Sequence, residues 1–276
     1  MHTFMRQEID GIQFEIKEPF DFGFLRAYGK VFRVFDDQDS GNICFGTEKD
    51  DEKYFIKFAG ASPIAYDGEP CEAVGRLKAT VPIYENLKHK NLITYVDSQE
   101  IGGGFAMRFQ WTDGVCMGRM YPESHRKFIS LAQEAKLQVF ADVLDFMQYT
   151  ASQKFVAIDF YDGSILYDFE KQKTTVCDID FFRKQPTVND MGRMWGSSMF
   201  MSPEEFEKSA VIDEVTNVYT LGAMAFALFG DYKRDLKSWS LNKNLYNVAV
   251  KSTNDDRDSR YQSVEELIYE WNRHCI

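Results

Sequence analysis

Short runs in which apolar and polar residues alternate fill the chain from residue 12 to about 111. Gly, Asp and Asn clusters separate these runs, which are rich in β-branched and aromatic residues: IQFEI, KVFRVF, NICFG, KYFIKF, LITYV and GFAMRFQW. Alternation with a period of two is the pattern of half-buried strands. This part of the chain therefore predicts an antiparallel sheet, which one helical stretch from residue 70 to about 87 interrupts.

The apolar residues take a helical period after Gly114. We predict a helix at about 128–153, a short strand-loop-strand that ends near Asp180, and two further helices at about 217–229 and 263–274. The chain thus predicts an α+β protein of two lobes. Residues 1–111 form a β-rich N-lobe, of which residues 1–33 are an N-terminal extension, and residues 112–276 form an α-helical C-lobe.

Composition and charge narrow the classes of partner. The chain has 276 residues, of which 44% are hydrophobic and 15% aromatic, so it can bury a sizeable core. Its 32 basic and 43 acidic residues give a net charge of −11, which argues against nucleic acid as the main partner. A basic or neutral partner fits this charge better.

Cysteine spacing and apolar run length bear on the compartment. The five cysteines are odd in number, scattered, and without CxxC or Cys/His spacing, so they predict neither a disulfide framework nor a zinc site. We expect buried thiols in a reducing compartment. The longest apolar stretch, residues 221–230, is too short to span a bilayer, and we expect a soluble cytoplasmic protein without membrane contact.

A nine-residue motif, GSSMFMSPE, runs from Gly196 to Glu204. It resembles the end of the activation segment in the protein-kinase superfamily, where the pattern is G-T-x-x-Y-M-A-P-E. In that family the glutamate is buried against an arginine late in the chain, so the resemblance implies that Glu204 pairs with Arg260. The alternative is that Ser-Pro-Glu only starts a helix, with proline in its first turn.

A second motif, NVYTLG, begins at Asn217 and is similar to the D-V-Y-S-L-G start of the helix that anchors a kinase C-lobe. Asn217 stands in place of the aspartate. The hydrogen bonds that this resemblance implies toward the catalytic loop would therefore be uncharged and weaker.

Two short motifs would carry the chemistry. VAIDFYDGSIL, which ends at Leu166, looks like the kinase catalytic loop H-R-D-L-K-x-x-N-I-L. The resemblance places Asp159 at the catalytic base and Ser164 at the Mg²⁺-binding asparagine, and DFF puts Asp180 at the metal-binding aspartate of D-F-G. The alternative is that both aspartates are only turn and strand-end carboxylates.

The N-lobe carries weaker matches to nucleotide-binding positions. YFIK resembles V-A-I-K, which makes Lys57 the candidate ligand of the α- and β-phosphates. SGNI lies about where a kinase Gly-rich loop closes, so Gly41 would approach the phosphates. Ile43 and Leu166 would then lie above and below adenine.

Several positions depart from the kinase pattern. The loop at residues 35–41 keeps one of three glycines and introduces three aspartates, which repel phosphate unless a cation intervenes. Phe55 replaces the small alanine beside adenine, and Tyr161 replaces the lysine aimed at the γ-phosphate. Thr80 stands where a helix glutamate would pair with Lys57, and Glu72 is the nearest substitute.

These motifs favour an ATP- and Mg²⁺-dependent phosphotransferase that resembles Ser/Thr protein kinases. The activation-segment motif favours a protein substrate. One alternative is a pseudokinase, a kinase-shaped module that regulates a partner protein. A third reading is a small-molecule kinase, which would require an enlarged acidic substrate cleft in the C-lobe.

Overall fold

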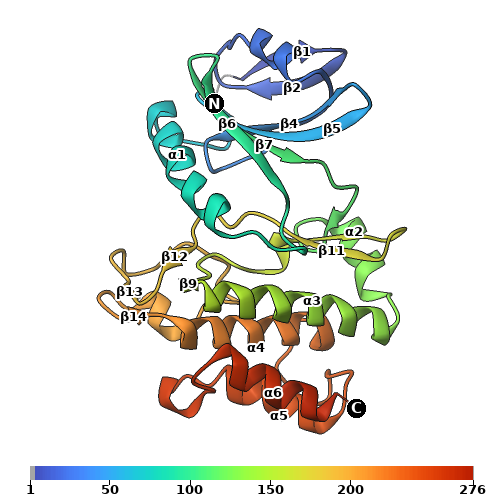
Figure 1. Ribbon diagram of the computed structural model, residues 1–276, viewed down its shortest axis with the longest axis vertical. Coiled ribbons are helices and arrows are strands. Elements are labelled where there is room, and N and C mark those ends of the chain that lie inside the picture. Colours follow the sequence, from blue (N-terminus) through green and yellow to red (C-terminus); the bar gives the residue numbers. More distant parts are fainter. Residues whose placement is uncertain (1–3, 276) are drawn as a thin grey trace. The chain divides into compact units, whose positions relative to one another are not determined.

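The chain has an α+β fold that divides into two compact units (Figure 1). The computed structural model describes residues 4–275. The N-terminal unit takes the described residues up to Glu85 together with Ile93–Thr112, and the C-terminal unit takes Asn86–Leu92 and the described residues from Asp113 on. This division lies one residue after the predicted seam, except that Asn86–Leu92 joins the C-terminal unit.

A five-stranded antiparallel sheet forms the frame of the N-terminal unit, in the order β3-β4-β5-β7-β6. The predicted runs account for its strands, although LITYV begins three residues before the strand that it predicted. Asp50 and Asp51 both have positive φ between β4 and β5, as a two-residue hairpin turn requires. The strands are β3 (Lys30–Phe35), β4 (Asn42–Lys49), β5 (Glu52–Ala59), β6 (Tyr95–Ile101) and β7 (Gly104–Gln110).

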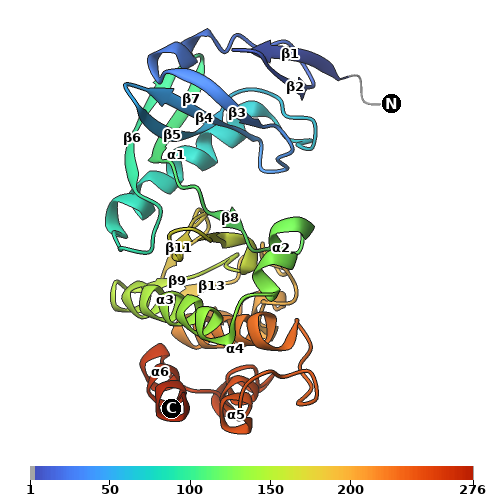
Figure 2. The same ribbon diagram turned by 90° about the vertical axis from the view of Figure 1, so that its right-hand side faces the viewer.

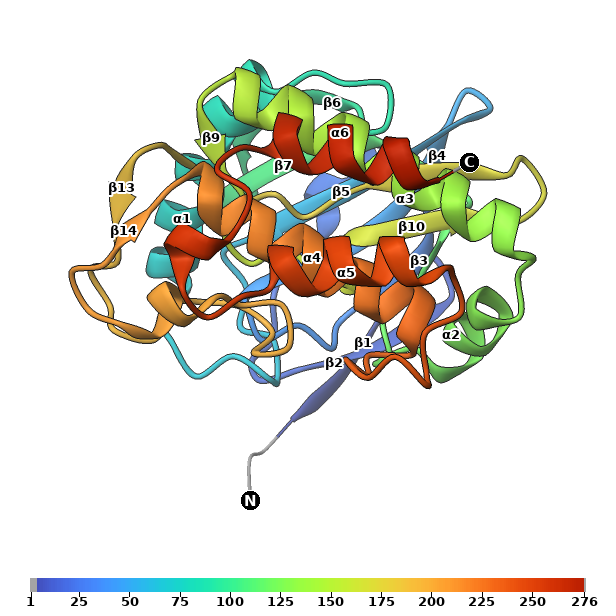
Figure 3. The same cartoon turned by 90° about the horizontal axis from the view of Figure 1, so that it is seen from below.

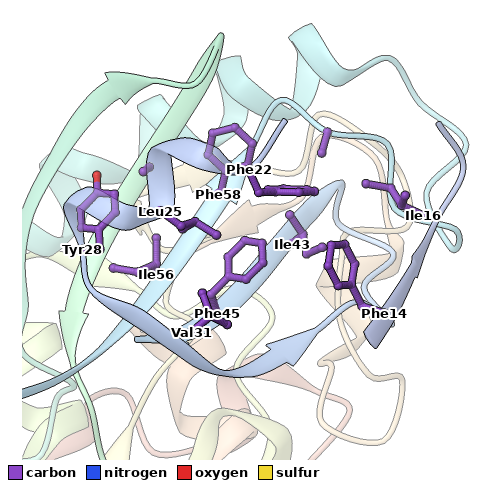
Figure 4. Packing of buried hydrophobic residues seen from close by; sticks show 12 residues of the cluster. Phe14, Ile16, Phe22, Leu25, Tyr28, Val31, Ile43, Phe45, Ile56 and Phe58 are labelled. Atoms are coloured by element: carbon purple, nitrogen blue, oxygen red, sulfur yellow. The ribbon is translucent and has the colours of Figure 1, made fainter. Parts of the chain in front are cut away.

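The N-terminal extension covers one face of this sheet. It forms the hairpin β1 (Met5–Ile9) and β2 (Ile12–Ile16) and the short 3-10 helix η1 (Gly23–Ala27), while residues 1–3 lie outside the described chain. Phe22 packs edge-on against Phe45 of the sheet, with ring centroids 5.3 Å apart. Figure 4 shows the resulting aromatic core between the extension and the sheet, whose burial stabilises the unit.

Helix α1 (Pro70–Asn86) packs on the opposite face of the sheet (Figure 2). The ring of Tyr84 lies 4.9 Å from that of Phe109, and Thr80 Oγ1 lies 3.2 Å from Met107 Sδ. The helix ends within one residue of the predicted position.

The C-terminal unit is built around α4 (Glu214–Gly230), in which every residue after the first is buried. A helix that is apolar all round must be enclosed by other elements, and Figure 3 shows α4 beside α5 and α6. The other elements are α2 (Pro122–Ile129), α3 (Gln133–Ser152), α5 (Lys243–Ser252), α6 (Val264–His274), and the short strands β8 (Val115–Cys116), β9 (Phe155–Val156), β10 (Ile165–Asp168), β11 (Lys173–Val176), β12 (Arg183–Lys184), β13 (Thr187–Val188) and β14 (Val211–Ile212).

Two helix predictions are corrected. The single helix predicted at 128–153 is two helices, because Ala132 takes an extended conformation with ψ of 149° between them. Helix α5 was missed, because its apolar positions are few and follow a polar stretch.

Two of the cysteines expected to be buried, Cys71 and Cys275, are exposed. Within residues 4–275, no helix is both long and apolar enough to cross a bilayer.

A buried ion pair between Glu204 and Arg260 joins distant segments of the C-terminal unit, which confirms the predicted pairing. Arg260 Nη1 and Nη2 donate to Oε1 and Oε2 of Glu204 at 2.8 and 3.0 Å. The Arg260 side chain is fully buried. Thr216 Oγ1 and Arg257 Nη1 also donate to Glu204, at 3.0 and 3.1 Å.

These bonds offset the cost of burying the carboxylate. Burial alone would raise the pKa of Glu204, but hydrogen bonds and charge from Arg260 lower it below its ordinary value. Ser202 also caps the 3-10 helix η3 (Pro203–Phe206), in which Pro203 takes the first position. The residues from Ser202 to Phe206 therefore start a 3-10 helix and also supply Glu204 to the ion pair.

We predict that Arg260→Ala destabilises the C-terminal unit by about 3–5 kcal/mol, because it leaves a buried carboxylate without its main partner. Urea unfolding of the purified chain measures this change. Arg257→Ala is the matched control, since the Arg257 side chain is 29% exposed and Glu204 keeps its bidentate partner. Equal costs for the two variants would contradict the prediction.

Candidate functional site

The predicted site residues divide between the two units, and each group is described within its own unit. Lys57, Gly41 and Ile43 belong to the N-terminal unit. The C-terminal unit holds the metal and base candidates together with one adenine-contact candidate: Asp159, Ser164, Leu166 and Asp180.

Lys57 is half-buried on β5, in register with Cys44 of β4 and Met107 of β7. Alternation places it on the sheet face that α1 covers. Ile43 pairs with Phe58 on the opposite face and is 1% exposed in the aromatic core. The predicted adenine contact of Ile43 is therefore corrected: Cys44 shares the face of Lys57.

The loop between β3 and β4 is tied to the rest of its unit. Asp36 Oδ2 accepts a hydrogen bond of 2.7 Å from the Glu15 amide. Gly41 has φ of +82°, and a Cβ there would lie 2.8 Å from the Cβ of Ala73 and 2.9 Å from the Tyr66 ring. Glycine is thus required at this position by backbone conformation and by close packing against α1.

The two candidates for the helix partner of Lys57 differ in burial. Thr80 is buried, and its hydroxyl donates to the Leu77 carbonyl at 2.8 Å. Glu72 is exposed in the first turn of α1.

In the C-terminal unit, Asn217 of α4 holds the backbone that leads to Asp159. Its Oδ1 accepts from the Ala157 amide at 2.8 Å, and its Nδ2 donates to the Phe155 carbonyl at 3.3 Å. An ionised aspartate could accept the first bond but could not donate the second. Both hydrogen bonds of this anchor are uncharged, as expected for asparagine, and the amide supplies one donor and one acceptor.

Asp159 is half-buried in a left-handed backbone conformation, with φ of 59°. Such a conformation in a non-glycine residue is uncommon and is concentrated at functional sites. With Gly196, Ser197 and Glu205, it lines a hollow too narrow to hold a water molecule. The catalytic-base candidate and the GSSMFMSPE motif therefore meet in one place within this unit.

Tyr161 lies among several carboxylates. Burial, followed by the charges of Asp159 and Asp178, raises the pKa of Tyr161, so the phenol stays protonated at neutral pH. Burial, together with the charges of Asp162 and Asp178, raises the pKa of Cys116 to about 11. These shared influences place Asp178 near the catalytic-loop segment.

Asp178 was missed by sequence reasoning. It follows the end of β11 by two residues and has φ of +55°. Sequence reasoning chose the half-buried Asp180 because a phenylalanine follows it, as in D-F-G. The other available signal was the position of Asp178 close behind a predicted strand.

Ser164 and Leu166 follow Asp159 in the short 3-10 helix η2 (Asp162–Ser164) and in β10. Ser164 is fully buried, and its Oγ has no hydrogen-bond partner within residues 4–275. Leu166 is half-buried and pairs with Cys116 of β8.

A hydroxyl without a partner beside carboxylates suits a hard cation such as Mg²⁺. In the described part of the chain, however, no group of three or more His, Cys, Asp or Glu residues could hold a metal ion. Mg²⁺ commonly binds through one or two carboxylates and completes its shell with water and substrate phosphates. That mode needs fewer protein carboxylates than a site built from protein ligands alone.

Asp162 is held by a residue far along the chain. The Tyr232 hydroxyl donates to Asp162 Oδ2, and Asp162 is 5% exposed. Burial and the hydrogen bond to Asp162 both raise the pKa of Tyr232, so it remains a donor. Asp162 thus fixes η2 to the loop after α4.

No family model matches the chain.

Glu205 is a buried carboxyl group that lines the same hollow as Asp159. Its Oε2 accepts from the Ser202 amide and hydroxyl at 2.7 and 2.9 Å. Burial dominates over these bonds and raises the pKa of Glu205 from 4.5 to about 7, with smaller contributions from Glu204 and Asp159. Glu205 is therefore largely protonated in slightly acidic solution and ionised above neutral pH.

We predict that Glu205 makes the protein less stable as the pH rises. Between pH 4.5 and about 7 the folded chain keeps a proton that the unfolded chain has lost. The stabilisation is thus fully present below pH 4.5 and is lost as the pH rises through about 7. Over that window the loss is about 3 kcal/mol at most.

Urea unfolding at about pH 5 and about pH 8 tests this effect, with Glu205→Gln as the control that keeps the acceptor for Ser202. The variant should lose less stability between the two pH values than the native chain. The same loss in both proteins would remove Glu205 from the pH dependence.

We predict that Tyr232→Phe destabilises the C-terminal unit by about 1–3 kcal/mol, because the buried Asp162 loses its donor. Chemical denaturation measures the change. Tyr269→Phe is the matched control, since Tyr269 is 67% exposed and its substitution should cost less than about 0.5 kcal/mol. If both variants behave alike, the bond between Tyr232 and Asp162 does not stabilise the fold.

Proposed function

We propose that the chain is an ATP- and Mg²⁺-dependent phosphotransferase with a two-lobed protein-kinase-like fold, acting on a protein substrate. The Glu204–Arg260 ion pair carries this proposal. The kinase resemblance required exactly these two residues to meet, although they are 56 positions apart. Asn217 adds support, because it anchors the segment before Asp159 from the helix that the resemblance named.

In this proposal Asp159 accepts or orients the proton of the acceptor hydroxyl. Its fixed backbone and its contact with the GSSMFMSPE segment orient the carboxylate. Ser164, with Asp180 or Asp178, would hold Mg²⁺, which neutralises charge on the phosphates. Catalysis then depends on positioning and electrostatics, without a covalent enzyme intermediate.

In this proposal each unit carries its own candidate nucleotide contacts. Lys57 would bind the α- and β-phosphates, and Gly41 would let the loop backbone approach them. Within the C-terminal unit Leu166 remains the candidate adenine contact, and within the N-terminal unit Cys44 takes that role in place of Ile43. Tyr161, which stays protonated, can donate a hydrogen bond where most Ser/Thr kinases use a lysine.

A pseudokinase is the second candidate, and two observations favour it. The β3–β4 loop would cover the phosphates in an active kinase. Here its Asp36 accepts a hydrogen bond from the Glu15 amide, which holds the loop in another interaction. Ser164 is fully buried, and a side chain must become accessible to bind a metal. In this alternative the chain has weak or no nucleotide turnover and regulates a partner protein.

Thermal unfolding with ATP and Mg²⁺, followed by a phosphotransfer assay, separates these candidates. A nucleotide at 100 times its Kd should add about 2.7 kcal/mol of stability. We predict that Asp159→Asn lowers phosphoryl transfer by about 100-fold or more, both to the chain itself and to acidic and basic test proteins. Nucleotide binding should be retained.

Asp255→Asn is the matched control, because Asp255 is an exposed aspartate of the same unit. Nucleotide stabilisation without transfer would support the pseudokinase instead. Neither stabilisation nor transfer, or transfer that is unchanged in Asp159→Asn, would refute the proposed mechanism.

A further inference from the structure

A pocket of about 210 Å³ opens in the C-terminal unit beside the GSSMFMSPE segment. Its apolar part is formed by Met199, Phe200, Ala223 and Phe226, and Tyr232 and Arg234 complete its lining. Pockets for drug-sized small molecules usually have volumes of about 300–1,000 Å³. This pocket is smaller and suits one apolar side chain of a larger partner.

Two guanidinium groups lie at this pocket, and their contacts within residues 4–275 are to neutral groups. Arg234 donates to the Tyr219 hydroxyl at 2.9 Å and to the Met199 carbonyl at 3.1 Å. Arg119 stacks 4.6 Å from the centre of the Tyr232 ring and lies 3.7 Å from Met199 Sδ. Both arginines are exposed.

The nearest acidic neighbour of Arg234 in sequence is already engaged elsewhere. Both carboxylate oxygens of Asp235 accept hydrogen bonds from Ser238, at 3.0 and 3.2 Å. A chain with net charge −11 thus leaves two arginines at one apolar pocket without carboxylate partners among its described residues. The local charge is complementary to an acidic ligand.

We propose that this pocket binds an apolar side chain in an acidic segment of the acceptor protein, with Arg119 and Arg234 pairing with the neighbouring carboxylates. This inference rests on the proposed phosphotransferase function and names its substrate class. It reverses the expectation of a basic or neutral partner, which followed from net charge alone.

The pocket is also linked to the catalytic-loop segment. Tyr232 lines the pocket, and its hydroxyl donates a hydrogen bond to Asp162, which lies three residues after Asp159. A side chain bound in the pocket would therefore be separated by one residue, Tyr232, from the loop that carries the candidate base. This arrangement would hold the acceptor segment beside the reacting groups.

Fluorescence anisotropy with three labelled synthetic peptides tests the proposal on the full chain without nucleotide. The first peptide contains a serine and a leucine flanked by glutamates, the second has lysines in place of the glutamates, and the third has alanine in place of the leucine. We expect the first to bind most tightly, and its affinity to fall as salt is added.

Arg119→Gln and Arg234→Gln should each weaken binding of the first peptide by about two- to fivefold, as expected for exposed ion pairs. Lys173→Gln removes the same charge from an exposed lysine outside the pocket and should change nothing. Arg119→Gln remains informative if Arg234→Gln unfolds, because within residues 4–275 Arg119 contacts only a stacked ring and a thioether.

The results separate this inference from the proposed function. Peptide binding that depends on both arginines but without phosphotransfer would keep the docking site and reject the enzyme. Phosphotransfer combined with arginine variants that bind like the native chain would reject the docking site alone. The inference is also overturned if the lysine peptide binds as well as the glutamate peptide, or if none of the peptides binds.

Discussion

The C-terminal unit depends on one buried charge and on the helix that encloses it. Glu204 could not remain ionised inside the protein without Arg260, because an isolated buried carboxylate is strongly disfavoured. The bidentate pair therefore fixes the end of the GSSMFMSPE segment to the turn before α6. Thr216 of α4 donates to the same carboxylate, so the pair also sets the position of that segment on the central helix.

Hydrogen bonds near both ends of helix α4 hold the candidate catalytic loop in place. Near its start, Asn217 bonds to the backbone on either side of Val156. Just beyond its end, Tyr232 bonds to Asp162. A buried helix has few ways to move, because close packing resists displacement. The loop that holds Asp159 is thus attached to a rigid support at two points, which is what positioning chemistry requires.

Sequence reasoning succeeded where a local pattern has one physical solution. Alternating runs predicted the strands, and the resemblance of GSSMFMSPE to the end of a kinase activation segment implied the pairing of Glu204 with Arg260. It failed where several local solutions exist. The break before α3 comes from one extended residue, Ala132, in an otherwise helical pattern. Ile43 was assigned to the wrong sheet face, because a one-residue shift in alignment moves a side chain across the sheet.

Charge gives the same lesson at a larger scale. Net charge describes the field far from the molecule, but at contact distance the nearest groups dominate, because solvent ions screen the rest within about 10 Å. The guanidinium groups of Arg119 and Arg234 therefore decide what the pocket beside Met199 attracts, although the chain as a whole is acidic. The acidic surface elsewhere would repel the same ligand. An acidic acceptor segment would thus be excluded from most of the surface and admitted at this pocket.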